Sequence, residues 1–293
     1  MEVLLPRSLE EALELKAAHP DAVPIAGGTD LMVEINFDLA RPEVILDLSR
    51  VEELATWRLE DGELFLGAGM TFARILRELP EMRALCQASR SVGSPQIRNR
   101  GTVGGNLGTA SPAGDALPVL AVHDAIVELG GAGGRRRSLP WDGFLVGVKR
   151  TALGPDELIL GARWRVLRGP QSFSKVGTRT AMVIAVASLC LALDPETRTV
   201  RTALGSVAPT VVRTSEAEVF LAREMERAGT WDDPSALLPA GAVEGFAERV
   251  AAAARPIDDV RGTAAYRAHA VGVLARRAVG WAIDELAEEA MVS

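Results

Sequence analysis

The sequence predicts an α+β fold: a small α/β unit, then a mixed α+β unit, then a C-terminal antiparallel sheet with helices. Three observations predict it. Strand-like and helix-like runs alternate over residues 3–48, Asp61 and Gly62 form a turn between two strand-like runs, and apolar runs from Val183 onward precede Ala-rich helical patterns. A β-α-β pattern favours parallel strands, whereas hairpins and meanders favour antiparallel ones. Both patterns in separate stretches of one chain are typical of an α+β protein.

Length and changes of pattern predict three sequential parts. The chain has 293 residues, more than most single hydrophobic cores contain. The strand–helix–strand pattern ends near residue 56, and a linker-like stretch with Gly154 and Pro155 precedes the later strands. We therefore expect a division into residues 1–56, 57–167 and 168–293.

The first part is expected to hold three strands and two helices. Ser8 and Glu11 form a capping box, which places the start of the first helix at Leu9. That helix ends before Pro20, and a buried strand then runs directly into a Gly-rich turn. The expected strands are residues 3–5, 22–25 and 43–48, and the expected helices are residues 9–17 and 31–35.

The middle part is expected to hold two hairpins with helices between them. Thr71 is a suitable N-cap for the helix that follows it. Three adjacent arginines, residues 135–137, are expected on a solvated edge strand. The expected strands are residues 57–60, 63–67, 125–129 and 135–139, and the expected helices are residues 72–79, 84–92 and 116–122.

The last part is expected to be an antiparallel meander followed by helices. The turn signal at residues 194–197 joins two apolar strands, and Ser215 with Glu218 predicts a second capping box. A strand at residues 158–166 is expected to end the middle part. The expected strands of the last part are residues 172–176, 183–193 and 200–206, and the expected helices are residues 215–228, 243–254 and 263–289.

Charge and composition exclude several classes of partner. A net charge of −7 disfavours nucleic acid and anionic membranes, because both select basic surfaces. The longest apolar candidate, residues 181–193, is too short to span a membrane, so no membrane insertion is expected. The N-terminus lacks the basic start and apolar core of a signal peptide, which predicts a cytoplasmic protein.

The cysteines and histidines predict neither a metal site nor a catalytic group. Cys86 and Cys190 are far apart in apolar stretches and are expected to be buried, inert thiols. His19, His123 and His269 show no metal-ligand spacing, and no nucleophile–base pair is evident. Any chemistry is therefore expected to come from an organic cofactor.

Two Gly-rich segments suggest a site for phosphate. One holds four glycines among small polar residues, and the other is a turn at residues 26–30 that directly follows a strand. Glycines let a backbone approach a ligand closely, and successive amides form a concavity that suits phosphate oxygens. The turn does not match G-x-G-x-x-G, so the nicotinamide dinucleotide motif is not met. A plain Gly-rich surface loop is the alternative. The four glycines of the longer segment are Gly101, Gly104, Gly105 and Gly108.

Four motifs make the chain resemble the FAD-binding subunits of the molybdenum hydroxylases, which include the medium subunits of aerobic carbon monoxide dehydrogenases and the flavin domain of xanthine dehydrogenase. They are P-I-A-G-G-T-D-L at residues 24–31, S-P-Q-I-R-N-R-G-T-V-G-G-N-L at 94–107, A-S-P-A-G-D at 110–115 and D-D-V-R-G-T-A-A-Y-R at 258–267. The resemblance runs along nearly the whole chain, and the motifs follow the family's order and spacing. The resemblance implies a two-part FAD-binding domain followed by the C-terminal domain.

The resemblance also implies which residues contact FAD. Asp115 and Lys175 match the family's FAD-binding aspartate and lysine, although Asp115 is also suited to cap a helix and Lys175 to be a solubility charge on a strand. Arg98 and Arg100 suit either a phosphate or a neighbouring carboxylate. The FAD-binding residues implied by the family are Pro24, Ile25, Ala26, Gly27, Gly28, Thr29, Asp30, Leu31, Val92, Thr102, Val103, Gly104, Gly105, Asn106, Ser111, Asp115, Ile159 and Lys175.

The family further implies an electron-transfer subunit within a hetero-oligomer, such as a dimer of heterotrimers. Its partners would be an iron–sulfur small subunit and a molybdopterin large subunit, and electrons would pass from the clusters through FAD to an external acceptor. No catalytic residue on this chain follows from the resemblance. Two alternatives remain: a free-standing FAD-dependent oxidase or dehydrogenase, and a non-catalytic assembly module with the same fold.

Overall fold

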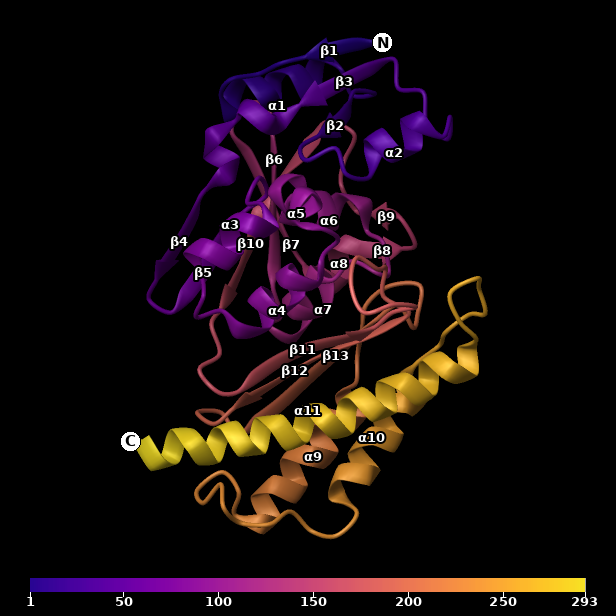
Figure 1. The fold of residues 1–293 in the computed structure, drawn as a ribbon. Helices are drawn as coiled ribbons and strands as arrows, with labels where there is room; N and C mark the ends of the chain where they lie inside the picture. The colour runs from indigo at the N-terminus through magenta and orange to yellow at the C-terminus, as the bar shows by residue number, and fades with distance from the viewer. Residues whose placement is uncertain (293) are drawn as a thin grey trace. The chain divides into compact units, whose positions relative to one another are not determined.

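The computed structural model describes residues 1–292, which fall into two compact units (Figure 1). Each unit is assembled from stretches that are separate in the sequence. The expected sequential division at residues 56 and 167 stays a prediction. Unit 1 comprises residues 1–80, 92–111 and 124–166, and unit 2 comprises residues 81–91, 112–123 and 167 onward.

Unit 1 begins with the predicted β-α-β motif. Strands β1 (Glu2–Leu4), β3 (Val44–Asp47) and β2 (Val23–Ile25) form a parallel sheet in the order β1-β3-β2. Helix α1 (Leu9–Ala18) connects β1 to β2, and the Ser8 side chain caps it as predicted. In such a sheet, all three carboxyl ends lie along one edge, where ligands of open α/β sheets are usually bound.

The second sheet of unit 1 is antiparallel and has the order β4-β5-β10-β6-β7. Both predicted hairpins are present, and the three arginines lie exposed on β7, an edge strand, as expected. A β-bulge interrupts the pairing of β10 between Ile159 and Gly161. The strands are β4 (Trp57–Glu60), β5 (Glu63–Gly67), β6 (Ile126–Gly131), β7 (Arg135–Pro140) and β10 (Glu157–Arg165).

Short helices and a small hairpin complete unit 1. Thr71 caps α3 as predicted. The Gly-rich stretch is not the loop suggested by its composition: Ser94 caps α5 and Thr102 caps α6, so most of it is helical. The elements are α2 (Leu31–Asn36), α3 (Phe72–Glu78), α5 (Pro95–Arg100), α6 (Val103–Thr109), α8 (Trp141–Phe144), β8 (Leu145–Gly147), β9 (Arg150–Thr151) and the 3₁₀ helices Leu48–Arg50 and Glu52–Ala55.

Unit 2 is built on the predicted antiparallel meander. Its sheet has the order β11-β12-β13-β14, and every residue of β12 is buried. A strand buried on both faces must have a layer on each side, which explains its almost entirely apolar sequence. The strands are β11 (Gln171–Val176), β12 (Ala187–Asp194), β13 (Thr199–Gly205) and β14 (Val212–Arg213).

Helices cover both faces of this sheet (Figure 1). Leu189, Leu191 and Leu193 point to a core that includes Phe246 and Leu274 of the C-terminal helices. Shorter helices pack on the opposite face, so unit 2 has three layers. The C-terminal helices are α9 (Ser215–Ala228), α10 (Ala242–Ala253) and α11 (Ala264–Val292), and those opposite are α4 (Arg83–Ser91) and α7 (Ala116–Val122).

Two local predictions in unit 2 are wrong. Ser215 is the first helical residue of α9 rather than its cap, because the carboxylate of Glu218 accepts hydrogen bonds from the Arg213 guanidinium and the Thr202 amide. Strand β12 begins four residues later than expected, since Met182 has a φ of 50° and the pairing with β11 begins only at Ala187. Cys86 and Cys190 are buried thiols, as predicted.

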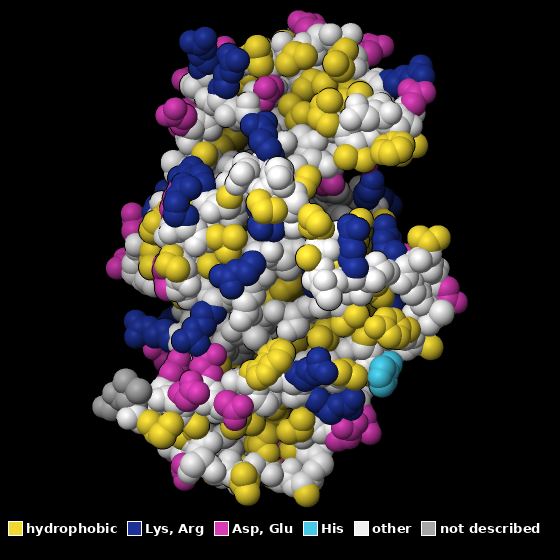
Figure 2. All heavy atoms as spheres, viewed as in Figure 1, with side chains coloured by type: hydrophobic (Ala, Val, Ile, Leu, Met, Phe, Trp, Pro, Cys, Tyr) yellow, Lys and Arg dark blue, Asp and Glu magenta, His cyan; other side chains and the backbone are white. Residues whose placement is uncertain are grey.

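The surface agrees with the acidic composition. On the face shown in Figure 2, Lys and Arg side chains form separate small groups among Asp and Glu, unlike the continuous basic stripe of a nucleic-acid-binding surface. Within residues 1–292, the helices fall short of the length and apolar character needed to cross a membrane.

Candidate cofactor site

The first Gly-rich segment is an open turn at the carboxyl end of β2. The chain leaves Ile25 and turns through residues 26–30 into α2. Gly28 has a φ of 73°, a conformation that glycine adopts without strain, and its carbonyl accepts from the Met32 amide at 3.1 Å. Within the described chain, the amides of residues 27–30 donate no hydrogen bond to the protein. The turn therefore presents several free donors at the edge where the sheet would bind a ligand.

The second Gly-rich segment has no free amides at its start. Each amide of residues 103–106 already donates within the unit, to the carbonyls of Met70, Ala68 and Thr102 and to the Thr102 hydroxyl, over 2.9–3.1 Å. The expectation that both segments offer amides to a phosphate therefore applies to the first segment only. Helix α6 can offer a ligand its side chains and its exposed backbone surface.

The glycines of α6 face two different environments. A Cβ on Gly104 would lie 2.6 Å from the Cβ of Ala68, so protein packing requires glycine there. Gly105 and Gly108 are exposed, and a Cβ on Gly108 would lie 3.5 Å from Ile159, an ordinary contact. A helical glycine costs about 1 kcal/mol relative to alanine. Because packing does not require Gly108, this exposed strip is suited to close approach by a ligand.

The two Gly-rich segments contact each other. A Cβ on Gly27 would lie 2.1 Å from the carbonyl oxygen of Arg100, so the turn rests directly on the chain between α5 and α6. At the other end, the Thr109 hydroxyl donates to Asp30 Oδ2 at 2.8 Å. The free amides of the turn and the glycine strip of α6 therefore belong to one surface of unit 1.

The remaining residues expected in unit 1 surround these segments or support them. Ile159 of β10 lies beside Gly108. The carbonyls of Val92 and Gly93 accept from Arg98 Nη1 at 3.0 and 2.9 Å, so Arg98 holds this turn rather than a carboxylate. Ser111 follows the left-handed residue that ends α6.

Asp115 and Lys175 belong to unit 2 and form a buried ion pair. Lys175 Nζ donates to Asp115 Oδ2 at 2.6 Å, to the Ser91 carbonyl at 2.9 Å and to the Val183 carbonyl at 3.0 Å. An ammonium has three protons, so all of its donors are engaged. The solubility-charge alternative for Lys175 is therefore wrong. The helix-cap alternative for Asp115 is wrong too, because its side chain makes no capping bond.

The buried Asp115 carboxylate has one oxygen atom without a hydrogen-bond partner among the described residues. The Ser91 hydroxyl donates to Oδ2 at 3.0 Å, whereas the buried Oδ1 has no hydrogen-bond partner among the described residues. Burial raises the pKa of the Asp115 carboxyl, and the positive charge of Lys175 opposes that rise. A buried acceptor without a partner fits a ligand that brings a hydroxyl or N–H group. Sequence reasoning missed Ser91, which no local pattern marks.

Comparisons with known proteins give one consistent result. Residues 1–163 match the family described as FAD binding domain in molybdopterin dehydrogenase, and residues 172–282 match the CO dehydrogenase flavoprotein C-terminal domain. The chain is 30% identical to the carbon monoxide dehydrogenase medium chain of Hydrogenophaga pseudoflava, over 94% of this chain and 96% of that one. It is 32% identical to the xanthine dehydrogenase FAD-binding subunit of Escherichia coli O157:H7, over 72% of this chain and 75% of that one. Its fold matches a chain of reconstituted CO dehydrogenase from Oligotropha carboxidovorans with a TM-score of 0.86 and 27% identity, covering 97% and 98% of the two chains.

Proposed function

The chain belongs to the family of FAD-binding subunits of molybdopterin dehydrogenases, as its motifs predicted, and from that premise we propose that it carries electrons within a molybdenum hydroxylase complex. FAD is the cofactor of this family. The observation that supports the proposal most strongly is the surface of unit 1 where free amides adjoin the exposed glycine strip of α6. Free amides suit a diphosphate, and the strip lets the rest of a flat cofactor lie close to the backbone.

Each group of residues has a distinct proposed task. The free amides of residues 27–30 bind the FAD diphosphate, and Gly105, Gly108 and Ile159 provide the surface that the cofactor contacts. Asp115 Oδ1 accepts a hydrogen bond from the cofactor, and Lys175 holds the Asp115 carboxylate in place. The other proposed FAD contacts are Pro24, Ile25, Ala26, Leu31, Val92, Thr102, Val103, Gly104, Asn106 and Ser111.

The proposed partners follow from the same family. When bound, FAD supplies a carrier that accepts electrons singly and passes them on in pairs. We propose that an iron–sulfur small subunit delivers those electrons, that a molybdopterin large subunit oxidises the organic substrate, and that an external acceptor receives them. The chain's own residues bind and orient the cofactor. The proposed location of this hetero-oligomer is the cytoplasm, which fractionation of the native cells would test.

Two measurements test the proposal. Denaturing the purified chain should release FAD, identified by chromatography of the supernatant, at about one equivalent per chain. In anaerobic samples, xanthine, an aldehyde or carbon monoxide should leave the flavin absorbance of the isolated chain unchanged. The substrate of the native complex should bleach the flavin once both partners are present. Bleaching of the isolated chain by such a substrate would instead identify a free-standing flavoenzyme, and a chain purified without flavin would favour the assembly module.

A further inference from the structure

We propose that Arg100 supplies the side-chain positive charge that binds the cofactor's diphosphate at the Gly27–Asp30 turn. This inference rests on the proposed function, because it names the counter-charge of that same site. Neither the family match nor the relatives' names assign a role to Arg100.

The position of Arg100 is the first reason. It is the last residue of α5, and its carbonyl oxygen lies against Gly27 so closely that glycine is required there. Because the main chain of Arg100 contacts the Gly27–Asp30 turn, its side chain begins close to the free amides of that turn. The side chain itself is exposed, whereas the backbone of the next residue, Gly101, is buried.

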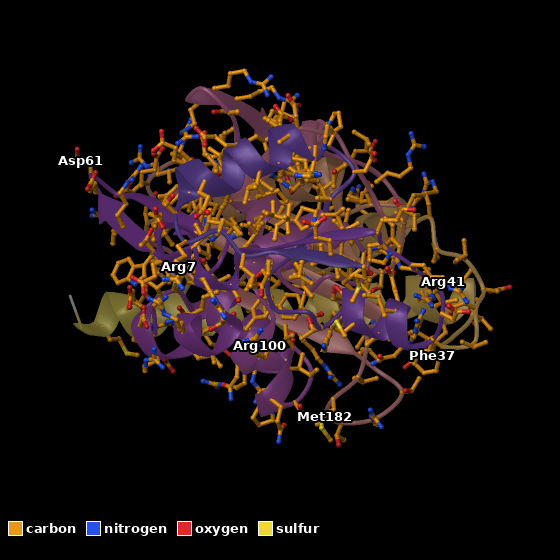
Figure 3. All side chains as sticks on the ribbon, turned by 90° about the horizontal axis from the view of Figure 1, so that it is seen from above. Arg7, Phe37, Arg41, Asp61, Arg100 and Met182 are labelled. Carbon is orange, nitrogen blue, oxygen red and sulfur yellow. The ribbon has the colours of Figure 1, made fainter. Side chains whose placement is uncertain are left out.

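The surrounding charges are the second reason. Arg98, two residues earlier, is bound to the carbonyls of Val92 and Gly93. Lys149 Nζ is paired with Glu34 Oε1 of α2 at 2.6 Å. Arg41 is paired with Asp38 and lies well apart from Arg100 in Figure 3. These three cations are therefore engaged elsewhere, whereas no ion pair or hydrogen bond of the Arg100 side chain occurs within residues 1–292.

A diphosphate at the turn needs such a cation. Asp30 lies at the end of the turn with an exposed carboxylate, which repels a second anion. The first amides of α6 are all engaged, so the backbone of that helix does not add to the four amides of the turn. A guanidinium binds two phosphate oxygens at once, which makes arginine the residue best suited to offset this charge.

Other arginines of unit 1 are less suited. Arg7 and Arg50 line a shallow pocket, but Glu52 and Glu53 line the same pocket and offset their charge. Arg136 lies on the exposed edge strand β7, and within residues 1–292 its guanidinium has one long hydrogen bond, of 3.5 Å, to the Arg135 carbonyl. Arg136 therefore serves as the matched control: an exposed arginine of the same unit whose loss changes net charge equally.

The test compares ligands with and without phosphate. The flavin-depleted chain and its Arg100→Ala, Arg100→Lys and Arg136→Ala variants are titrated with FAD, with riboflavin, and with ADP and adenosine as competitors. Arg100→Ala should weaken FAD and ADP about tenfold to a hundredfold, because a hydrogen-bonded charge pair is lost. Riboflavin and adenosine should bind as in the wild type. The slope of log Kd against log salt concentration should fall in Arg100→Ala, and Arg100→Lys should recover part of the affinity.

Three outcomes of these titrations would contradict the proposal, and each has a different meaning. Unchanged FAD affinity in Arg100→Ala would reject the assignment of Arg100 while leaving the proposed function intact. An equal loss for riboflavin or adenosine would show that Arg100 acts through packing, which also rejects it. A wild-type chain that binds no FAD would reject both the assignment and the proposed function.

Discussion

The two Gly-rich segments of unit 1 are alike in composition and opposite in structure. The turn at residues 26–30 keeps its amides free, whereas the segment at residues 102–108 folds into a capped helix whose first amides are all bonded to protein. Glycine also has two uses. At Gly27 and Gly104 it admits the backbone of a neighbouring segment, and at Gly108 it leaves space on the outside. A Gly-rich stretch thus indicates close approach, and the structure decides whether protein or ligand approaches.

The first prediction concerns the buried Asp115–Lys175 pair, in which a single carboxylate oxygen lacks a hydrogen-bond partner among the described residues. Lys175→Met would leave the buried Asp115 carboxylate without its counter-charge, and should lower the free energy of unfolding by about 3–5 kcal/mol. Urea denaturation measures this loss. Because burial raises the Asp115 pKa, the native state of the variant binds a proton more readily than the unfolded state does. The loss should therefore shrink as the pH falls.

Two controls distinguish the loss of the buried counter-charge from the effect of replacing any lysine by methionine. Lys149→Met removes an exposed pair with Glu34 and should cost less than about 1 kcal/mol. Replacing both partners, with Asp115→Asn added to Lys175→Met, should restore part of the stability. A Lys175→Met variant as stable as Lys149→Met would show that the Asp115–Lys175 pair is solvated rather than buried.

The second prediction tests glycine as a packing device. Gly104→Ala places a methyl group 2.6 Å from Ala68 Cβ and 2.7 Å from its carbonyl oxygen, and should cost about 1–3 kcal/mol. Thermal unfolding of the cofactor-free chain measures it. Gly280→Ala is the control, since a Cβ there meets nothing within 4 Å in helix α11, and it should be stabilising. A Gly104→Ala variant with normal stability would mean that Ala68 can move aside.

The smallest expected effect is at the link between the two segments. Thr109→Val removes the hydroxyl that donates to Asp30, an exposed carboxylate, and should cost about 0.5–1.5 kcal/mol. Thr56→Val, which removes a local exposed bond to the Glu53 carbonyl, is the control. FAD affinity should fall in Thr109→Val alone. Equal FAD affinity in the two variants would show that the turn keeps its position without α6.

Much of the fold follows from local sequence signals. The Ser8 and Thr71 caps, the Asp61–Gly62 hairpin and the meander of unit 2 are all in place, because each depends on residues close together in the chain. The same principle predicts α5 and α6 from Ser94 and Thr102, but the glycines and small polar residues of the stretch suggested a loop. Three glycines within α6 did not prevent helix formation, since Thr102 caps the helix and Val103 and Leu107 are buried.

The details of the site depend on distant residues and could not be predicted. Whether the first two amides of α6 are free is decided by Ala68 and Met70, over thirty residues earlier in the chain. Asp115 and Lys175 are sixty residues apart, so no spacing rule reveals that they form a buried pair or that Ser91 joins them. The resemblance to a family named these two residues as FAD contacts, whereas the structure shows that Lys175 has no proton left to donate.

The central claim is that FAD binds against the exposed face of α6 where Gly105 and Gly108 carry no side chain. The Gly108→Ala variant tests this claim most directly. The added methyl meets Ile159 at an ordinary 3.5 Å, so the cofactor-free chain should melt at the same temperature as the wild type or slightly higher. FAD should bind about tenfold more weakly, because the methyl occupies the space that the cofactor needs. Wild-type FAD affinity in Gly108→Ala would contradict the account and place the cofactor away from this face.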